Sequence, residues 1–319
     1  MVGLNCLRRS GSNLGTRLVP GVVSAAVAGL LVTGAGCSNE RTQTFEEAGD
    51  FGIDTGQVSL TVDPRGARIT DVHLAGGANL LSGPSADPSN FGSTFWTSPQ
   101  SLWGWPPPAA FDSAAYTATR ASASVEFVGP TDSTFGVSLT KRFSPGGTGS
   151  RIDAAYEVTA QTRAMSVAPW EITRVPPGGL TFYPTGTGAP MAGGGFALPP
   201  TEDAAGCTWI QDAGAGTDQK LLADGAGGWL AHVAGDTLLV KKFNDIPPGM
   251  AAPGEAEIEV FVQGQGAYVE VEEQGAYQAV AQGKSLTWNV TWIVARLPAG
   301  LSATVGSADL VAFVQQLVQ

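Results

Sequence analysis

Short segments in which apolar and polar residues alternate, separated by glycine- and proline-rich turns, recur along most of this 319-residue chain. Val58, Leu60 and Val62 alternate with polar residues, and later segments such as "DTLLVKKF" and "LTWNVTWIVARL" are bounded by Gly, Pro or Asp. Because successive side chains of a strand point to opposite faces, a period of two predicts half-buried β-strands. Helix-period patterns are almost absent, and the 43 glycines suit many turns between short strands.

One hairpin and one helix are predicted from local patterns. Apolar residues alternate over 137–143, the turn "SPGGTGS" follows, and alternation resumes over 152–158. Near the end of the chain Ser307 is a candidate N-cap, and a stripe of apolar residues at helical spacing follows it, namely Leu310, Phe313, Val314 and Leu317. We therefore expect an all-β fold, one large antiparallel sandwich over residues 51–319, with a short C-terminal helix.

Residues 1–36 have the features of an export signal peptide. Three arginines precede the apolar stretch Leu18–Val32, which is too short for an ordinary membrane span and leads through small residues to Cys37. The sequence "LLVTGAGC" resembles the lipobox of bacterial lipoproteins, although Gly34 stands where that family usually has leucine. The resemblance implies a lipidated Cys37, a tether over residues 37–50 and a membrane-anchored protein of the cell envelope. Ser38 favours the outer membrane, and secretion without a lipid or a retained anchor are the alternatives.

Charge and cysteine content exclude several classes of protein. Residues 1–36 hold three basic and no acidic residues, so their removal would change the formal net charge from −11 to −14, and such a surface repels nucleic acid. Outside the signal and the proposed lipid site only Cys207 remains, so no disulfide framework is expected. No His/Cys cluster has zinc spacing, and Asp212, Asp218 and Asp224 do not follow a calcium-loop pattern, so we expect neither a metal nor another cofactor.

Motifs spread over nearly the whole expected domain point to one superfamily. They are "GARITDVHLAGGANLL", "FWTSPQSLWGWPPP", "SVAPWEITRV", "GWLAH" with "LLVKKF", and "AYVEVEEQGAY" with "AQGKSLTWNVTW". In this order they resemble the galactose-mutarotase-like (aldose 1-epimerase-like) superfamily, in a bacterial branch that is largely a domain of unknown function. The resemblance runs from about Val58 to Leu297. It implies a β-supersandwich whose concave face binds carbohydrate in the relatives.

Two glutamates are the candidate bases. Mutarotation needs a base for the anomeric hydroxyl and an acid for the ring oxygen. In "YVEVEEQ", Glu270 and Glu272 would point to the same face of a strand, and the resemblance implies that one of them occupies the place of the superfamily's glutamate base. Two carboxylates so close raise one another's proton affinity, which suits such a base. The alternative is a polar outward face with Val269 and Val271 packed behind it.

The acid histidines of the superfamily have no counterpart in this chain. The resemblance implies that their positions fall in the Trp96–Trp105 motif and at Trp170, where this chain has no histidine. His73 fits a residue on the face of a strand, whereas His232 is a candidate acid that would line the concave face, with a structural role as the alternative. Lys241 is a candidate source of positive charge near the cleft.

Sugar recognition needs aromatic plates for the C–H faces of the ring and polar groups for its hydroxyls. The candidate substrate-binding residues are Trp96, Gln100, Trp103, Trp105, Trp170, Glu171, Arg174 and Lys241. Core filling is the alternative for each tryptophan, above all for Trp288 and Trp292. Prolines after Trp105 cannot join a sheet interior, so we expect a rigid loop at a sheet end.

Three functions are consistent with these features. The leading hypothesis is an exported, lipid-anchored domain that binds a mono- or oligosaccharide, with catalysis left open. The enzymatic alternative is an aldose or sugar-phosphate epimerase with Glu270 or Glu272 as base and His232 or a lysine as acid. The third is a structural protein of the cell envelope whose aromatic patch contacts another protein.

Overall fold

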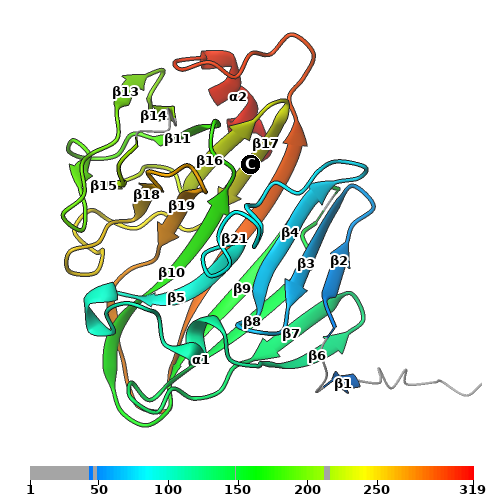
Figure 1. Cartoon of the computed structure of the whole chain (residues 1–319), viewed down its shortest axis with the longest axis vertical. Coiled ribbons are helices and arrows are strands. Elements are labelled where there is room, and N and C mark those ends of the chain that lie inside the picture. Colours follow the sequence, from blue (N-terminus) through cyan, green and yellow to red (C-terminus); the bar gives the residue numbers. More distant parts are fainter. Residues whose placement is uncertain (1–42, 46–48, 148, 212–215) are drawn as a thin grey trace, which may run out of the picture. The chain divides into compact units, whose positions relative to one another are not determined.

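Strands dominate the computed structural model, which describes residues 43–45, 49–147, 149–211 and 216–319. Within these residues the strands form two antiparallel sheets, one of 11 strands and one of 10, and helices are few and short (Figure 1). This confirms the predicted all-β sandwich. The expected signal and Cys37 lie outside the described residues. In the described part of the chain, no helix is long and apolar enough to cross a membrane.

The 11-stranded sheet has the long strand β21 near its middle, paired with β9 and β17. In sheet order its strands are β1 (Gln43–Phe45), β6 (Thr117–Ala121), β7 (Ser124–Val128), β8 (Val137–Pro145), β9 (Arg151–Ala160), β21 (Ser285–Arg296), β17 (Thr237–Lys242), β16 (Trp229–Ala234), β11 (Leu180–Pro184), β14 (Cys207–Gln211) and β13 (Thr201–Ala204). β8 and β9 form the predicted hairpin, with Phe143 opposite Ala154. β1 lies in the segment assigned to the tether and pairs with β6.

The 10-stranded sheet carries β10 among its central strands, between β19 and β5. In sheet order its strands are β12 (Met191–Ala192), β15 (Gln219–Ala223), β18 (Ile258–Val262), β19 (Val269–Gln274), β10 (Met165–Val175), β5 (Ser93–Ser98), β4 (Arg68–Leu74), β3 (Val58–Asp63) and β2 (Phe51–Asp54), while β20 (Gln278–Val280) pairs with β10 alone. Every residue of β10 from Val167 to Val175 is buried, so both faces of this strand are covered.

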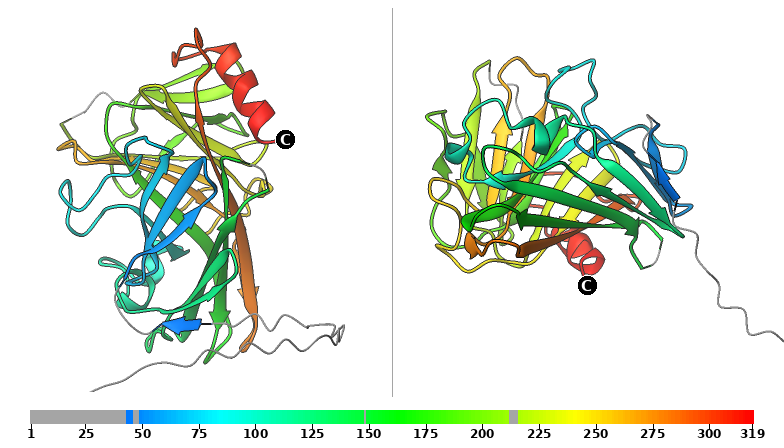
Figure 2. Two further views of the ribbon diagram at one scale, coloured as in Figure 1. Left: turned by 90° about the vertical axis from the view of Figure 1, so that its right-hand side faces the viewer. Right: turned by 90° about the horizontal axis from the view of Figure 1, so that it is seen from below.

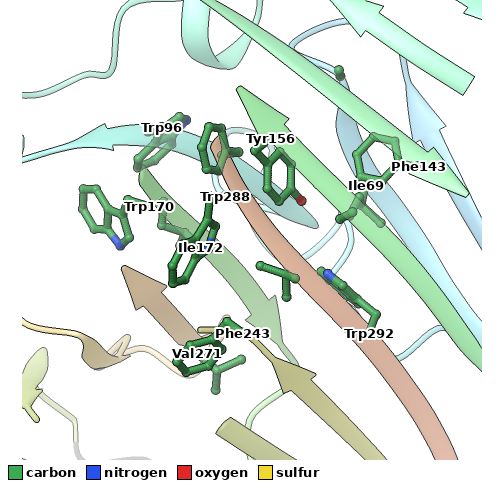
Figure 3. Close-up of a cluster of buried hydrophobic side chains, with 14 of the residues drawn as sticks. Ile69, Trp96, Phe143, Tyr156, Trp170, Ile172, Phe243, Val271, Trp288 and Trp292 are labelled. Atoms are coloured by element: carbon green, nitrogen blue, oxygen red, sulfur yellow. The ribbon is translucent and has the colours of Figure 1, made fainter. Parts of the chain in front are cut away.

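The main core lies between the two sheets, and a second core lies on the far side of the 11-stranded sheet. In the main core, Phe95 of β5 stacks on Tyr156 of β9 with ring centroids 4.1 Å apart. Trp288 and Trp292 of β21 are buried there, as expected (Figure 3). The helix α2 (Ala308–Leu317) covers the second core, and the Ser307 side chain accepts a hydrogen bond from the Leu310 amide, which confirms the predicted closing helix (Figure 2).

Candidate functional site

The tryptophan-rich segment begins as a buried strand and continues as a surface loop. Trp96 lies on β5, and the short helix η1 (Gln100–Leu102) follows. Gly104 has a φ of 73°, a left-handed conformation that glycine adopts without strain, and it separates Trp103 from Trp105. Trp105 remains 60% exposed. The segment therefore places one tryptophan in a sheet and another on an exposed loop beside it.

Four tryptophans from this segment and from β10 form one aromatic cluster. Trp170 lies directly opposite Trp96 in the β10–β5 pairing, and their ring centroids are 5.7 Å apart (Figure 3). Trp96 also contacts Trp103 at 5.6 Å and Trp105 at 6.2 Å, all with edge-to-face geometry. The Trp103 indole N–H donates to the Thr97 carbonyl. Such edge-to-face pairs stabilise the arrangement beyond simple area burial.

A cleft of about 740 Å³ opens over this cluster. Five of the residues named from the sequence line it, and they are Trp96, Gln100, Trp105, Trp170 and Glu270. Other walls come from Lys220 of β15, Phe261 of β18 and Tyr268 just before β19. The volume lies within the range of about 300–1,000 Å³ that is usual for small-molecule sites.

Alternation along β10 decides which of its residues face the cleft. Trp170 and Ile172 line it, and Arg174 lies on the same face, with its Nε 2.9 Å from Glu270 Oε1. The guanidinium of Arg174 also lies 5.4 Å from the centre of the Trp96 ring. Trp103 supports the cluster without lining the cleft, and Arg174 holds Glu270 in place.

Glu272 lies on the same face as Glu270, as the spacing predicts, but it is fully buried beneath Trp170. The Trp170 indole N–H donates to Glu272 Oε2 at 2.8 Å. Val269 and Val271 pack on the opposite side in the main core. The two valines therefore pack behind the glutamates, as the alternative expects, but the glutamates are not solvated, because Glu272 is buried and Glu270 half-buried.

Lys220 is the cation at the base of the cleft, and carboxylates surround it. Its Nζ lies 2.6 Å from Glu259 Oε2 and 3.5 Å from Glu272 Oε1. Burial raises the pKa of Glu272 to about 8 and that of Glu259 to about 7. Burial alone would lower the pKa of Lys220, but Glu259 and Glu272 raise it above its ordinary value. Lys220 thus stays charged, because the carboxylates beside it favour its ammonium form.

Glu171 and Lys241 lie between the sheets instead of in the cleft, because each occupies the inward position of its strand. Lys241 Nζ is 3.0 Å from Glu171 Oε2 and 2.7 Å from Glu273 Oε2. Tyr156 and Trp292 of the 11-stranded sheet donate hydrogen bonds to Glu171. Burial raises the pKa of Glu273 well above its usual value. Burial would also raise the pKa of Glu171, but the charge of Lys241 and hydrogen bonds with Glu273 and Tyr156 lower it below its ordinary value.

Both histidines lie away from the cleft. His232 is buried on β16 in the 11-stranded sheet, where its Nδ1 is 2.9 Å from Thr181 Oγ1. His73 lies on β4 and contacts the Asp71 carboxylate. The structure therefore does not bring His232 together with Glu270 and Glu272. Among the described residues, no group of three or more His, Cys, Asp or Glu could hold a metal ion.

Several residues of the cleft were not identified from the sequence. Tyr268 precedes Glu270 by two positions, so strand alternation could have placed it on the same face. Lys220 is a lone lysine at the start of a strand, a pattern that suggests a solvated side chain. Glu255 and Phe196 come from loops, where no periodicity shows which way a side chain points. Only the folded chain brings these loops over the sheet.

Comparison with known proteins supports the fold. No protein-family model matches this chain, and no curated protein matches it either. Among solved structures, a galactose mutarotase-like protein from Lactobacillus casei aligns with a TM-score of 0.53 and 12% identity over 77% of this chain and 100% of that one. A candidate aldose 1-epimerase from Escherichia coli K12 aligns with a TM-score of 0.53 and 12% identity, covering 79% of this chain and 100% of the other.

A TPR-domain containing protein from Parabacteroides distasonis aligns with a TM-score of 0.54 and 11% identity over 83% of this chain and 56% of that chain. At such low identities the likeness concerns the fold and not the activity. Three observations point to the same fold, namely the two large antiparallel sheets, the order of the sequence motifs and these structural neighbours. The chain has the galactose-mutarotase-like β-supersandwich fold.

Proposed function

We propose that the cleft on the 10-stranded sheet binds a neutral carbohydrate. The exposed Trp105 at its rim offers an aromatic face for the C–H surface of a sugar ring, and the buried Trp96 and Trp170 line the space beside it. Gln100 and Glu270 offer polar groups for hydroxyls in the same space. This combination of an exposed tryptophan, a supporting tryptophan cluster and polar side chains in one cleft is the observation that carries the proposal.

The charges around the cleft favour a neutral sugar over a phosphorylated one. The ammonium of Lys220 is engaged by Glu259 and Glu272, and the guanidinium of Arg174 by Glu270. An anionic group would have to break one of these buried pairs, which costs about 3–5 kcal/mol when a partner is lost. A sugar-phosphate epimerase is therefore the less favoured of the sequence-based alternatives.

Calorimetric titration of the purified protein tests this proposal. We expect measurable binding of at least one neutral sugar and weaker binding of its phosphorylated form. Trp105→Ala should weaken binding by about three- to tenfold, the effect of about 0.7–1.4 kcal/mol from a lost aromatic contact. Val128→Ala, an exposed apolar change on β7 of the other sheet, is the matched control and should leave affinity unchanged. Silence across a broad panel would contradict sugar binding, and tighter binding of the phosphate would contradict neutrality.

Interconversion of sugar anomers is a second candidate function, because Glu255 and Glu270 line the same cleft. Burial raises the pKa of Glu255, which suits a carboxyl that donates a proton, and Glu270 would then be the base. Polarimetry on freshly dissolved anomers distinguishes this from binding alone. An enzyme predicts faster equilibration that is lost in Glu270→Gln, whereas a binding module predicts no acceleration.

The sequence of residues 1–37 supports a further proposal, export and anchoring in the cell envelope through a lipid on Cys37. Metabolic labelling with an alkyne fatty acid should mark the protein and fail to mark Cys37→Ala. Unlabelled protein released into the medium would indicate plain secretion instead. A structural role in the envelope would be favoured by a stable crosslinked protein partner together with no sugar binding.

A further inference from the structure

A second hollow of about 280 Å³ lies next to the cleft, on the other side of Glu255. The two spaces share the side chains of Leu222, on β15, and Glu255, in the loop before β18. The second hollow extends toward Met191 of β12 at the edge of the sheet. The two spaces therefore adjoin each other at Leu222 and Glu255.

We propose that this second hollow is a subsite for a further sugar unit, so that the protein's ligand is a neutral oligosaccharide and not a monosaccharide. This inference rests on the proposed carbohydrate-binding function of the tryptophan cleft. The chain of the ligand would run from Trp105 and Trp170 across Glu255 toward Met191. It adds the length and the direction of the ligand to the function proposed above.

Glu255 is fixed at the junction of the two spaces. Its Oε1 accepts a hydrogen bond of 2.8 Å from the backbone N–H of Gln100, which ties the loop that carries Glu255 to the segment that carries the tryptophans. A carboxyl held in this position can contact hydroxyls of two adjacent sugar units. Leu222 provides an apolar floor beneath the same junction.

The second hollow has the chemical mixture that a sugar unit needs. Met191 is 66% exposed, and together with Ile246 and Pro247 it offers apolar surface for the C–H face of a ring. Asp224 lies on another wall, and its Oδ2 is oriented by hydrogen bonds from the Thr187 amide and hydroxyl. Its carboxylate gives the ring hydroxyls an acceptor.

Titration with a chain-length series of one neutral sugar tests the proposal. We expect the disaccharide or trisaccharide to bind at least about tenfold more tightly than the monosaccharide, a difference of about 1.4 kcal/mol. Ala189→Trp places a large side chain in the second hollow from an exposed position. This variant should reduce oligosaccharide affinity to the monosaccharide level without changing monosaccharide affinity. Ala312→Trp, an exposed position on α2, is the matched control and should behave as the wild type.

Met191→Ala removes the exposed apolar wall without adding bulk and should weaken oligosaccharide binding several-fold while sparing the monosaccharide. Equal affinities for all chain lengths, or an Ala189→Trp variant that binds oligosaccharides like the wild type, would overturn the second subsite and leave the tryptophan cleft as proposed. Failure of sugars of every length to bind would overturn both proposals.

Discussion

Replacement of Lys241 by methionine tests where this lysine acts. Its ammonium is fully buried between the sheets, 3.0 Å from Glu171, 2.7 Å from Glu273 and 2.7 Å from the Thr173 hydroxyl. Methionine keeps much of the side-chain volume but leaves the carboxyls without their cation. Loss of one partner from a buried pair costs about 3–5 kcal/mol. For a domain of this size, that corresponds to a fall in Tm on the order of 10 °C.

Calorimetry and urea denaturation measure this loss, with sugar affinity determined in parallel. Lys242→Met, at the half-buried neighbouring position, is the control and should cost less than about 1 kcal/mol. Adding Glu171→Gln to Lys241→Met should restore part of the stability, because the amide oxygen can still accept from Tyr156 and Trp292. A Lys241→Met protein of wild-type stability, or one that loses only sugar binding, would refute the reasoning.

Two further predictions concern stability. Burial raises the folded-state pKa of Glu257 to about 7 and that of Glu272 to about 8. At these two groups the folded protein therefore binds more protons than the unfolded chain. The free energy of unfolding should fall from pH 5 to pH 7, by up to about 1.4 kcal/mol per pH unit for one such group. Denaturation in urea at several pH values measures this slope, which Glu257→Gln should flatten, and rising stability would contradict it. Gly66→Ala should lower the free energy of unfolding by several kcal/mol, since the added Cβ would lie 1.8 Å from the Asp112 carbonyl oxygen. Gly56→Ala is the control, because Gly56 also has a positive φ but open space around it, and this change should cost about 1 kcal/mol. Equal losses of stability in the two variants would refute the steric argument.

The fold could be predicted because several of its strands have one covered face and one more open face. Burial alternates strictly along β9 and along β3, where Val58, Leu60 and Val62 are the buried positions. The sequence of the C-terminal helix contains both an N-cap residue and an apolar stripe, and in the structure Ser307 caps the helix as expected. These features depend on residues that are close in sequence.

The candidate site could be predicted only in part. Because β10 is buried on both faces, its sequence does not show which side chains face the cleft and which face the other sheet. Trp170 and Glu171 are neighbours, yet one lines the cleft and the other points between the sheets. The same two-sided burial hides the inward position of Lys241. Glu255 reaches the cleft from a loop, and a loop's position over a sheet depends on long-range packing that no local pattern contains.

A crystal structure of the protein with the neutral sugar that binds most tightly is the most direct test of the account. We predict a sugar ring stacked on Trp105, with carbon atoms within about 4 Å of the indole face and hydroxyls bonded to Gln100 or Glu270. A sugar bound elsewhere on the molecule, with this cleft empty, would contradict the central claim.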